Sequence, residues 1–219
     1  MDIEIKIDVL SPMHLGSGQE DVNLDAEIVH DACGLPYFPA KRFKGLLYES
    51  ALEVLEMSEL SSCGLISEQT LKELFRHDDT ESDVQLIVSD FYLKPEKAYN
   101  QIRIELEALE NTYPEFLRPS DVLDAYTSVR YQTKLKDGVA DKGTLHNMRV
   151  LDAGNIAFYG TVQMLNGEDR HLSAFALALR NLSFAGMKRN RGFGHIQCSM
   201  TDKAKEHELL AAALAGEVE

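Results

Sequence analysis

The sequence predicts an α+β fold of the ferredoxin-like (RRM-like) type, in which two helices cover one face of an antiparallel sheet. Two observations predict it. The order strand, helix, strand occurs twice along the 219 residues, and each of these segments shows the apolar period of its type. A chain of this length holds one such core together with inserted segments.

The first half of the predicted core begins with a strand at residues 2–10, where isoleucine and valine alternate with charged residues. An amphipathic helix of about 17 residues follows Pro39, and its apolar residues recur three and four positions apart. Residues 84–93 form the next predicted strand.

The second half repeats this order. Residues 156–164 alternate as a strand, residues 169–184 form a helix that Gly186 ends, and residues 196–200 form a short last strand. We expect the tail from Lys203 onwards to be a short helix.

Two insertions separate the halves. Residues 94–124 are acidic and mixed in pattern, which predicts a helical or irregular lobe. Residues 127–136 and 144–152 have the pattern of two arms of an extended hairpin with a long tip.

The net charge of −14 argues against a nucleic-acid partner, because phosphate neutralisation supplies much of the affinity for DNA or RNA. The distribution of the charge changes this interpretation. Residues 53–124 hold 17 acidic and 6 basic residues, whereas Arg170 to Thr201 holds five basic residues and no acidic one. This segregation predicts one basic face.

The cysteines and the hydropathy indicate the compartment. Cys33, Cys63 and Cys198 lie far apart with no Cys-x-x-Cys pair, which argues against a disulfide framework and against a zinc site. No apolar run approaches the roughly 18 residues of a membrane span, and the charged N-terminus is unlike a signal peptide. We expect a cytoplasmic protein without a membrane partner.

Two segments are suited to binding phosphate. The first predicted helix starts with Lys41, Arg42 and Lys44, although helix N-termini normally attract acidic residues, and free backbone N–H groups beside cations bind phosphate. The loop from Gly186 to Gly194 combines glycines, which permit close backbone approach, with cations and a phenylalanine that could stack on a base. In both places a solvated basic turn is the alternative.

A carboxylate-rich segment between these elements offers chemistry. Asp25 could hold a divalent ion or accept the proton of a ribose hydroxyl, and His14 could serve as a base. A solvated aspartate and a structural histidine are the alternatives.

Taken together, the motifs resemble the repeat-associated mysterious protein (RAMP) superfamily over nearly the whole chain. The resemblance rests on His14-Leu15-Gly16, on the D-x-x-G-x-P-Y-x-P pattern from Asp31 to Pro39, on Lys44-Gly45, and on Arg191-Gly192-Phe193-Gly194 in the glycine-rich loop. The hairpin residues Arg130, Lys142 and Arg149 are similar to that superfamily's thumb. The chain departs from the family pattern at Ala40-Lys41-Arg42 and at Ala185, where glycine or serine is common.

The resemblance implies the repeated backbone subunit of a type III CRISPR effector complex. It implies a palm (residues 1–93 and 153–202), an inserted lid (about 94–124), a thumb hairpin (about 125–152) and a C-terminal tail (203–219). The implied partners are guide RNA, complementary target RNA, copies of the chain or related subunits in a filament, and other effector subunits.

The resemblance also implies the site residues. Asp25, six residues before Asp31, matches the family's catalytic aspartate, which cleaves target RNA with a divalent metal, Mg or Mn, for which Asp25 is the expected ligand; Asp21 is the next candidate. RNA contacts are expected at His14, Lys41, Arg42, Lys44, Arg130, Lys142, Arg149, Lys188, Arg189, Arg191 and Phe193. Close backbone approach is expected at Gly16, Gly18, Gly45, Gly186, Gly192 and Gly194. Lys44 and Arg191 should then share one face.

Three other functions stay open. A subunit of the same fold could bind guide RNA without cutting the target. A guide-processing endoribonuclease of the same superfamily would use His14 as general base, although such enzymes usually have two tandem ferredoxin-like domains. A protein–protein adaptor would carry these basic loops incidentally.

Overall fold

The computed structural model describes residues 1–18, 24–76, 81–136, 139–140 and 144–215. Its central elements follow the ferredoxin-like order: β1 (Asp2–Val9), α1 (Ala40–Ser61), β3 (Gln85–Val88), β9 (Ala157–Leu165), α5 (Asp169–Asn181) and β10 (Ile196–Met200). The main sheet has the strand order β10-β1-β9-β4-β2, and β3 also pairs with β9. All these strand pairs are antiparallel, so the predicted fold class is confirmed.

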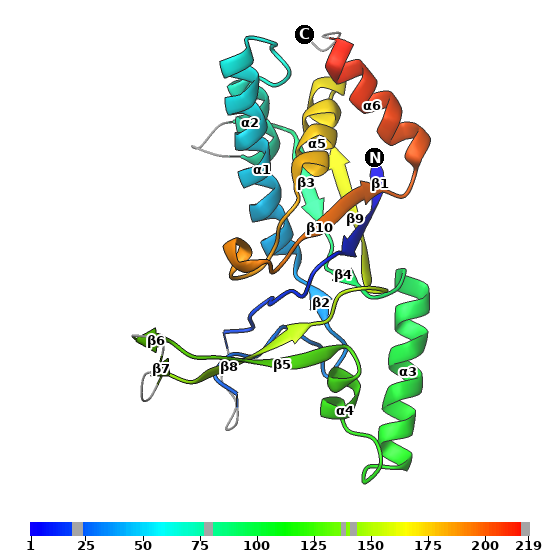
Figure 1. Ribbon diagram of the computed structural model, residues 1–219. Coiled ribbons are helices and arrows are strands. Elements are labelled where there is room, and N and C mark those ends of the chain that lie inside the picture. The colour runs from blue at the N-terminus through cyan, green and yellow to red at the C-terminus, as the bar shows by residue number, and fades with distance from the viewer. Residues whose placement is uncertain (19–23, 77–80, 137–138, 141–143, 216–219) are drawn as a thin grey trace.

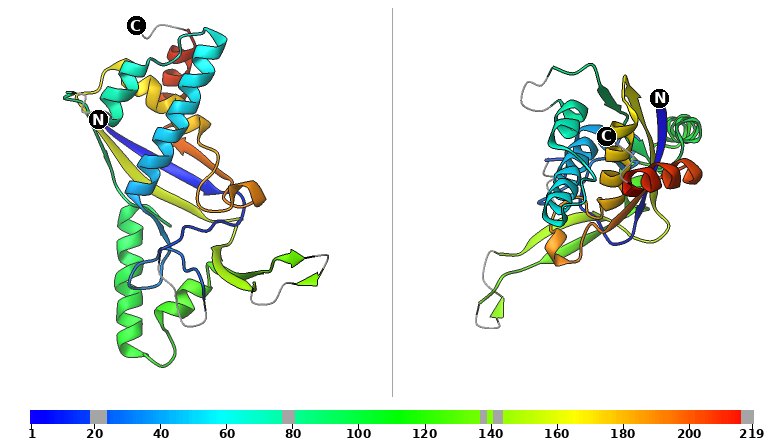
Figure 2. Two further views of the ribbon diagram at one scale, coloured as in Figure 1. Left: turned by 90° about the vertical axis from the view of Figure 1, so that its left-hand side faces the viewer. Right: turned by 90° about the horizontal axis from the view of Figure 1, so that it is seen from above.

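The core lies between the sheet and the helices α1 and α5, which cover one face of it (Figures 1 and 2). The apolar residues of β1 all point to this side, because side chains alternate along a strand, and Ile3, Ile5, Ile7 and Val9 are at most 4% exposed. The two helices are joined directly, since the hydroxyl of Ser50 on α1 donates to the Ala178 carbonyl on α5 at 2.8 Å.

The predicted strand at 84–93 forms two short strands, β3 and β4 (Phe91–Tyr92), with a break at Ser89-Asp90. The break has a physical reason. The side chain of Asp90 accepts a hydrogen bond from the Ala40 amide at 2.7 Å and so satisfies the first turn of α1, which its N-cap Pro39 does not cap with a side chain. The short strand β2 (Tyr37–Phe38) pairs with β4.

The helices differ from the predictions mainly in length. α1 has 22 residues instead of about 17, α5 ends at Asn181 before the predicted limit, and α6 (Lys203–Ala215) follows β10. The sequence pattern did not predict α2 (Glu68–Phe75), which packs against α1 and α5.

The insertions form two bodies that extend from the sheet (Figure 1). The acidic segment contains the long helix α3 (Glu96–Thr112) and the short helix α4 (Pro119–Asp124). The hairpin pairs β5 (Thr127–Gln132) with β8 (His146–Leu151), and β6 (Leu135–Lys136) pairs with β7 (Val139–Ala140) farther out.

The state of the cysteines and the lengths of the apolar helices can also be read from the structure. The three cysteines are free thiols; Cys33 and Cys198 are buried, and Cys63 is exposed just beyond α1. Among the described residues, no helix is both long enough and apolar enough to cross a membrane.

Candidate functional site

Four segments that are far apart in the sequence meet around one cavity of about 460 Å³. They are the loop after β1, the carboxylate-rich segment, the first turns of α1 and the glycine-rich loop. The lining residues are His14, Gly16, Gly18, Asp25, Ala26, Glu27, Arg42, Leu46, Gly186 and Met187. The predicted phosphate-binding segments and Asp25 therefore share a site.

His14 is only 1% exposed and joins the core of the molecule to the hairpin. Its Nδ1 lies 2.6 Å from the carbonyl oxygen of Arg149, and a carbonyl only accepts, so Nδ1 carries the proton. Burial lowers the pKa of His14 and outweighs the hydrogen bond to the Arg149 carbonyl, which acts the other way. A neutral His14 therefore presents an unprotonated Nε2.

Gly16 is required by the position of that ring. A Cβ at residue 16 would lie 2.8 Å from His14 Nε2, closer than side-chain carbons approach. The spacing of the His-x-Gly motif thus follows from steric contact within the chain.

The glycine-rich loop packs directly on the His14 turn. Gly186 has a positive φ of 79°, and a Cβ there would lie 2.5 Å from the His14 carbonyl oxygen, to which the Met187 amide donates at 3.0 Å. A Cβ at Gly194 would lie 1.9 Å from the Ala185 carbonyl oxygen. These two glycines let the loop approach protein backbone; Gly192 has a positive φ with open space around its Cα.

The cations of this loop have different surroundings. Lys188 Nζ contacts Gln132 Oε1 at 2.5 Å and Met148 Sδ at 3.1 Å, so it reaches the hairpin, and burial together with nearby Arg191 lowers its pKa. Arg189 lies 3.5 Å from Glu49 of α1, whereas Arg191 is exposed. Phe193 is half-buried.

At the start of α1, Lys44 and Arg42 have different surroundings. Lys44 Nζ donates to the Leu86 carbonyl of β3 at 3.3 Å, and burial and Arg76 lower its pKa. Residues of a helix are separated by about 100°, so Lys44 lies about 200° around α1 from Arg42, and Arg42 lines the cavity instead. Lys44 therefore contacts β3 and is not among the residues that line this cavity, and its position on one face with Arg191 stays a prediction.

Arg42 binds the loop after β1, since its Nη2 donates to the Gly16 carbonyl at 2.8 Å. Lys41 and Gly45 are exposed on the first turns of the same helix. Gly45 has open space around its Cα, so its lack of a side chain is not required by neighbours in the described chain.

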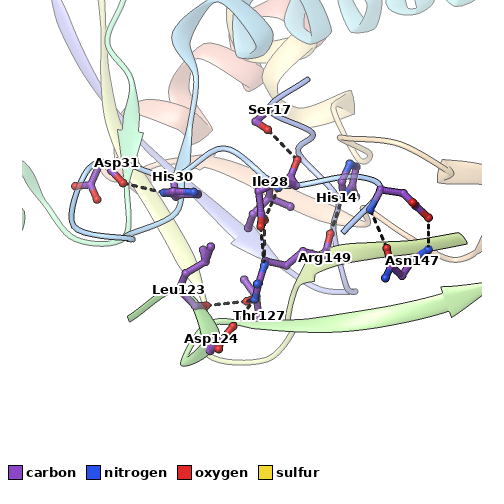
Figure 3. A network of polar contacts seen from close by, with 12 residues as sticks. His14, Ser17, Ile28, His30, Asp31, Leu123, Asp124, Thr127, Asn147 and Arg149 are labelled. Atoms are coloured by element: carbon purple, nitrogen blue, oxygen red, sulfur yellow. Dashed lines mark hydrogen bonds and ion pairs between the residues drawn. The ribbon is translucent and has the colours of Figure 1, made fainter. Parts of the chain in front are cut away.

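Arg149 of the hairpin is held by carboxylates, and its expected role as an RNA contact stays a prediction. Its Nε lies 3.0 Å from Glu27 Oε1, and its Nη1 binds Asp124 and, at 3.0 Å, the Thr127 hydroxyl (Figure 3). The side chain is 15% exposed. Arg130 of the same hairpin is exposed, and Lys142 lies outside the described residues.

Asp25 lies beside β8 of the hairpin. Its carboxylate Oδ2 accepts from the Asn147 amide at 2.8 Å and lies 3.5 Å from His146 Nδ1, and its own amide donates to Asn147 Oδ1 at 2.8 Å. The next residue, Ala26, forms a parallel bridge with Met148. Asp25 is thus bonded to the edge of β8, whereas Asp21 lies outside the described residues.

A smaller cavity of about 160 Å³ connects Asp25 to the glycine-rich loop. It is lined by His14, Asp25, Ala26, His146, Asn147, Met148, Met187 and Lys188. The sequence analysis did not find His146 and Asn147, because they follow Asp25 by more than 120 residues and belong to no motif.

The described residues do not by themselves fit a resident metal. No group of three or more His, Cys, Asp or Glu side chains in that part of the chain could hold an ion. The Mg or Mn ion expected at Asp25 would need ligands from elsewhere, such as phosphate oxygens and water, which Mg²⁺ commonly keeps.

Comparisons with known proteins agree with the fold. The family model described as RAMP superfamily matches residues 6–197. A chain of the type III-B Cmr-β complex bound to cognate target RNA, solved by cryo-EM, superposes with a TM-score of 0.65 at 12% identity, over 96% of this chain and 99% of that chain. A chain of the apo state of Cmr-β gives 0.64 at 11% identity, over 93% and 98%. A search of curated protein sequences finds no match.

Proposed function

The chain belongs to the RAMP superfamily, and we propose on this basis that it is an RNA-binding backbone subunit of a type III CRISPR effector complex. Both similar solved structures are type III-B complexes, and one of them is described as bound to target RNA. The observation that supports the proposal most is the meeting of four distant segments around one cavity. The partners would be guide RNA, target RNA, copies of this subunit in a filament and other effector subunits.

Cations on either side of this cavity would hold the ribose-phosphate chain. Arg42 lines the cavity, and Lys188 lines the smaller cavity beside it and reaches the hairpin. Arg191 is exposed and acts on the pKa of Lys188, and the exposed Arg130 pairs with Met148 of the smaller cavity. Asp25 and Glu27 line the same cavity and repel phosphate, so the backbone of the RNA should lie against the glycine-rich loop. Such contacts carry little base specificity.

We further propose that Asp25 takes part in cutting the target strand. Its carboxylate would take the proton of a ribose 2′-hydroxyl, the 2′-oxygen would bond to the adjacent phosphorus, and the bond from phosphorus to the 5′-oxygen would break. The leaving 5′-oxygen takes a proton from water, which gives a 2′,3′-cyclic phosphate and a 5′-hydroxyl. A Mg or Mn ion entering with the RNA would offset charge on the phosphate.

The test compares Asp25→Asn with Glu56→Gln, an equal loss of charge at an exposed residue of α1. An asparagine at position 25 still accepts from the Asn147 amide, so the local structure should persist. In a complex assembled on guide RNA, Asp25→Asn should bind target RNA at least as tightly as the wild type, because a charge that repels phosphate is removed, and should lose cutting by roughly 100-fold or more. Glu56→Gln should cut as the wild type does.

The second candidate is a scaffold that binds RNA without cutting. It is favoured by the hydrogen bond from the Asn147 backbone amide to Asp25 Oδ2, which gives that carboxylate oxygen a structural partner. Equal cutting by wild type and Asp25→Asn would establish the scaffold function for this subunit. Failure of the wild type to bind RNA at low salt would contradict both.

A further inference from the structure

The position of Asp25 is set by the hairpin. The segment 24–28 runs along the outer edge of β8, where Arg149 N donates to the Ala26 carbonyl at 3.0 Å and Asn147 N donates to Asp25 at 2.8 Å. On its other side, the segment is tied to the loop after β1 by the antiparallel bridge between Gly16 and Ile28 and by the Ser17 amide, which donates to the Glu27 carbonyl at 2.8 Å. Asp25 therefore precedes the point at which the segment joins the palm.

The side chain of Arg149 joins this segment to the base of the hairpin. One arm of the guanidinium binds Glu27, whose side chain is 13% exposed, and the other arm binds Asp124 at the end of α4 and Thr127 at the start of β5. Figure 3 shows Arg149 between Asp124 and Thr127 on one side and the segment on the other. Arg149 and Glu27 are largely buried, so leaving either charge without the other is costly, whereas Asp124 is 63% exposed and water can solvate it.

Glu27 has a second bond that fixes its own backbone. Its Oε1 accepts from the Ile28 amide at 2.8 Å, so the carboxylate bridges Arg149 and the segment that carries Asp25. Only Ala26 separates Glu27 from Asp25, and both residues line the same cavity. A shift of the Glu27 carboxylate would therefore move Asp25 along the edge of β8.

We propose that Arg149 and Glu27 form a positioning pair, which sets the place of Asp25 relative to RNA held by the palm and the hairpin. The proposal rests on the proposed function, because it gives the pair a role in the cutting step. It assigns different effects to the two arms of Arg149. Loss of the Glu27 arm should displace Asp25, whereas loss of the Asp124 arm should leave it in place.

The first experiment measures amide hydrogen exchange in the full-length protein. Glu27→Gln keeps the acceptor for Ile28 and removes the charge that binds Arg149; Asp124→Asn is the matched control on the other arm. Exchange of the Asn147 and Arg149 amides should accelerate at least about tenfold in Glu27→Gln and change little in Asp124→Asn. Equal protection in wild type and Glu27→Gln would overturn the proposal, whether or not the protein cuts RNA.

The second experiment separates positioning from stability. In the assembled complex, Glu27→Gln should bind target RNA at least as tightly as the wild type does. It should cut that RNA roughly 10–100-fold more slowly in single turnover, because small displacements of a reacting group are costly. The double variant Glu27→Gln/Arg149→Lys should cut no more slowly than the slower single variant, since both changes remove one interaction. A parallel loss of affinity and of thermal stability in Glu27→Gln would show a merely structural role.

The two experiments also distinguish this proposal from the proposed function. If the wild type does not cut RNA while exchange at Asn147 responds to Glu27→Gln as expected, the catalytic role of Asp25 is wrong and the pair is a structural clamp only. If the wild type cuts and both variants cut equally well, the positioning pair is wrong and the function stands.

Discussion

The glycine-rich loop and the hairpin were both predicted to supply cations for RNA, and the fold uses them differently. Arg191 of the loop is exposed, and its backbone amide bonds within the loop to the Lys188 carbonyl. Arg149 of the hairpin lies between Glu27 and Asp124 and is 15% exposed. In so acidic a chain, a cation is available for RNA only where the fold keeps carboxylates away from it.

The largest expected effect is a loss of stability when Arg149 of the hairpin is replaced. Arg149→Ala leaves the Glu27 carboxylate, 13% exposed, without its cation and should lower the free energy of unfolding by about 3 kcal/mol. Arg130→Ala, on the exposed part of the same hairpin, should change it by less than about 0.5 kcal/mol. Urea unfolding of both variants measures the difference, and equal losses would show that Arg149 is not held as described.

The loop should be sensitive through its glycines. Gly194→Ala places a Cβ 1.9 Å from the Ala185 carbonyl oxygen at a positive φ, and should cost about 2–3 kcal/mol of unfolding free energy. Gly192→Ala meets open space at a similar φ and should cost about 1 kcal/mol. A larger loss at Gly192 in thermal unfolding would contradict this account of the loop.

Replacing an exposed cation should change the affinity for RNA and leave the stability of the protein unchanged. Arg191→Ala should weaken binding of single-stranded RNA several-fold and reduce the slope of log affinity against log salt by about 0.7, with unfolding unchanged. Glu27→Gln, which frees Arg149 from a carboxylate, should leave that slope the same because Asp124 still neutralises the guanidinium. A salt titration of each variant checks both expectations.

The smallest effect concerns pH. Burial lowers the pKa of His14 in the folded protein below its ordinary value of 6.5, so in the window below that value the unfolded chain binds a proton that the folded chain does not. The free energy of unfolding should therefore fall as pH decreases through and below about 6.5. Above about 6.5, the contribution of His14 to it should not change with pH. His14→Gln should remove this component from unfolding measurements between pH 5 and 7. An unchanged pH profile in that variant would assign the component to another group.

Much of the fold could be predicted, because the spacing of apolar residues within each segment distinguishes strands from helices. The alternation in β1, β9 and β10 and the apolar stripes of α1 and α5 set both the elements and their buried sides. The break between β3 and β4 was not predictable, since it arises from the Asp90 side chain capping a helix 50 residues earlier in the chain. α2 was missed because it is short and five of its eight residues are polar.

The residues of the site could be predicted from the sequence, but most of their interaction partners could not. The motifs located His14, Asp25 and the glycine-rich loop, which the fold does bring together. The side on which Lys44 projects depends on its phase along α1, which helix period could have supplied. The partners of Arg149 could not be predicted, because Glu27 and Asp124 belong to two other segments and meet it only in the folded chain.

The exposed thiol of Cys63 allows RNA binding to be followed by fluorescence. It follows the end of α1, and a hydrogen bond with Ser61 lowers its pKa, so a maleimide dye should couple there while Cys33 and Cys198 remain buried. Arg42 stands at the opposite end of the same helix, about 30 Å away at 1.5 Å per residue. A dye at Cys63 and an acceptor on the RNA would thus report docking from a distance suited to energy transfer, without occupying the cavity.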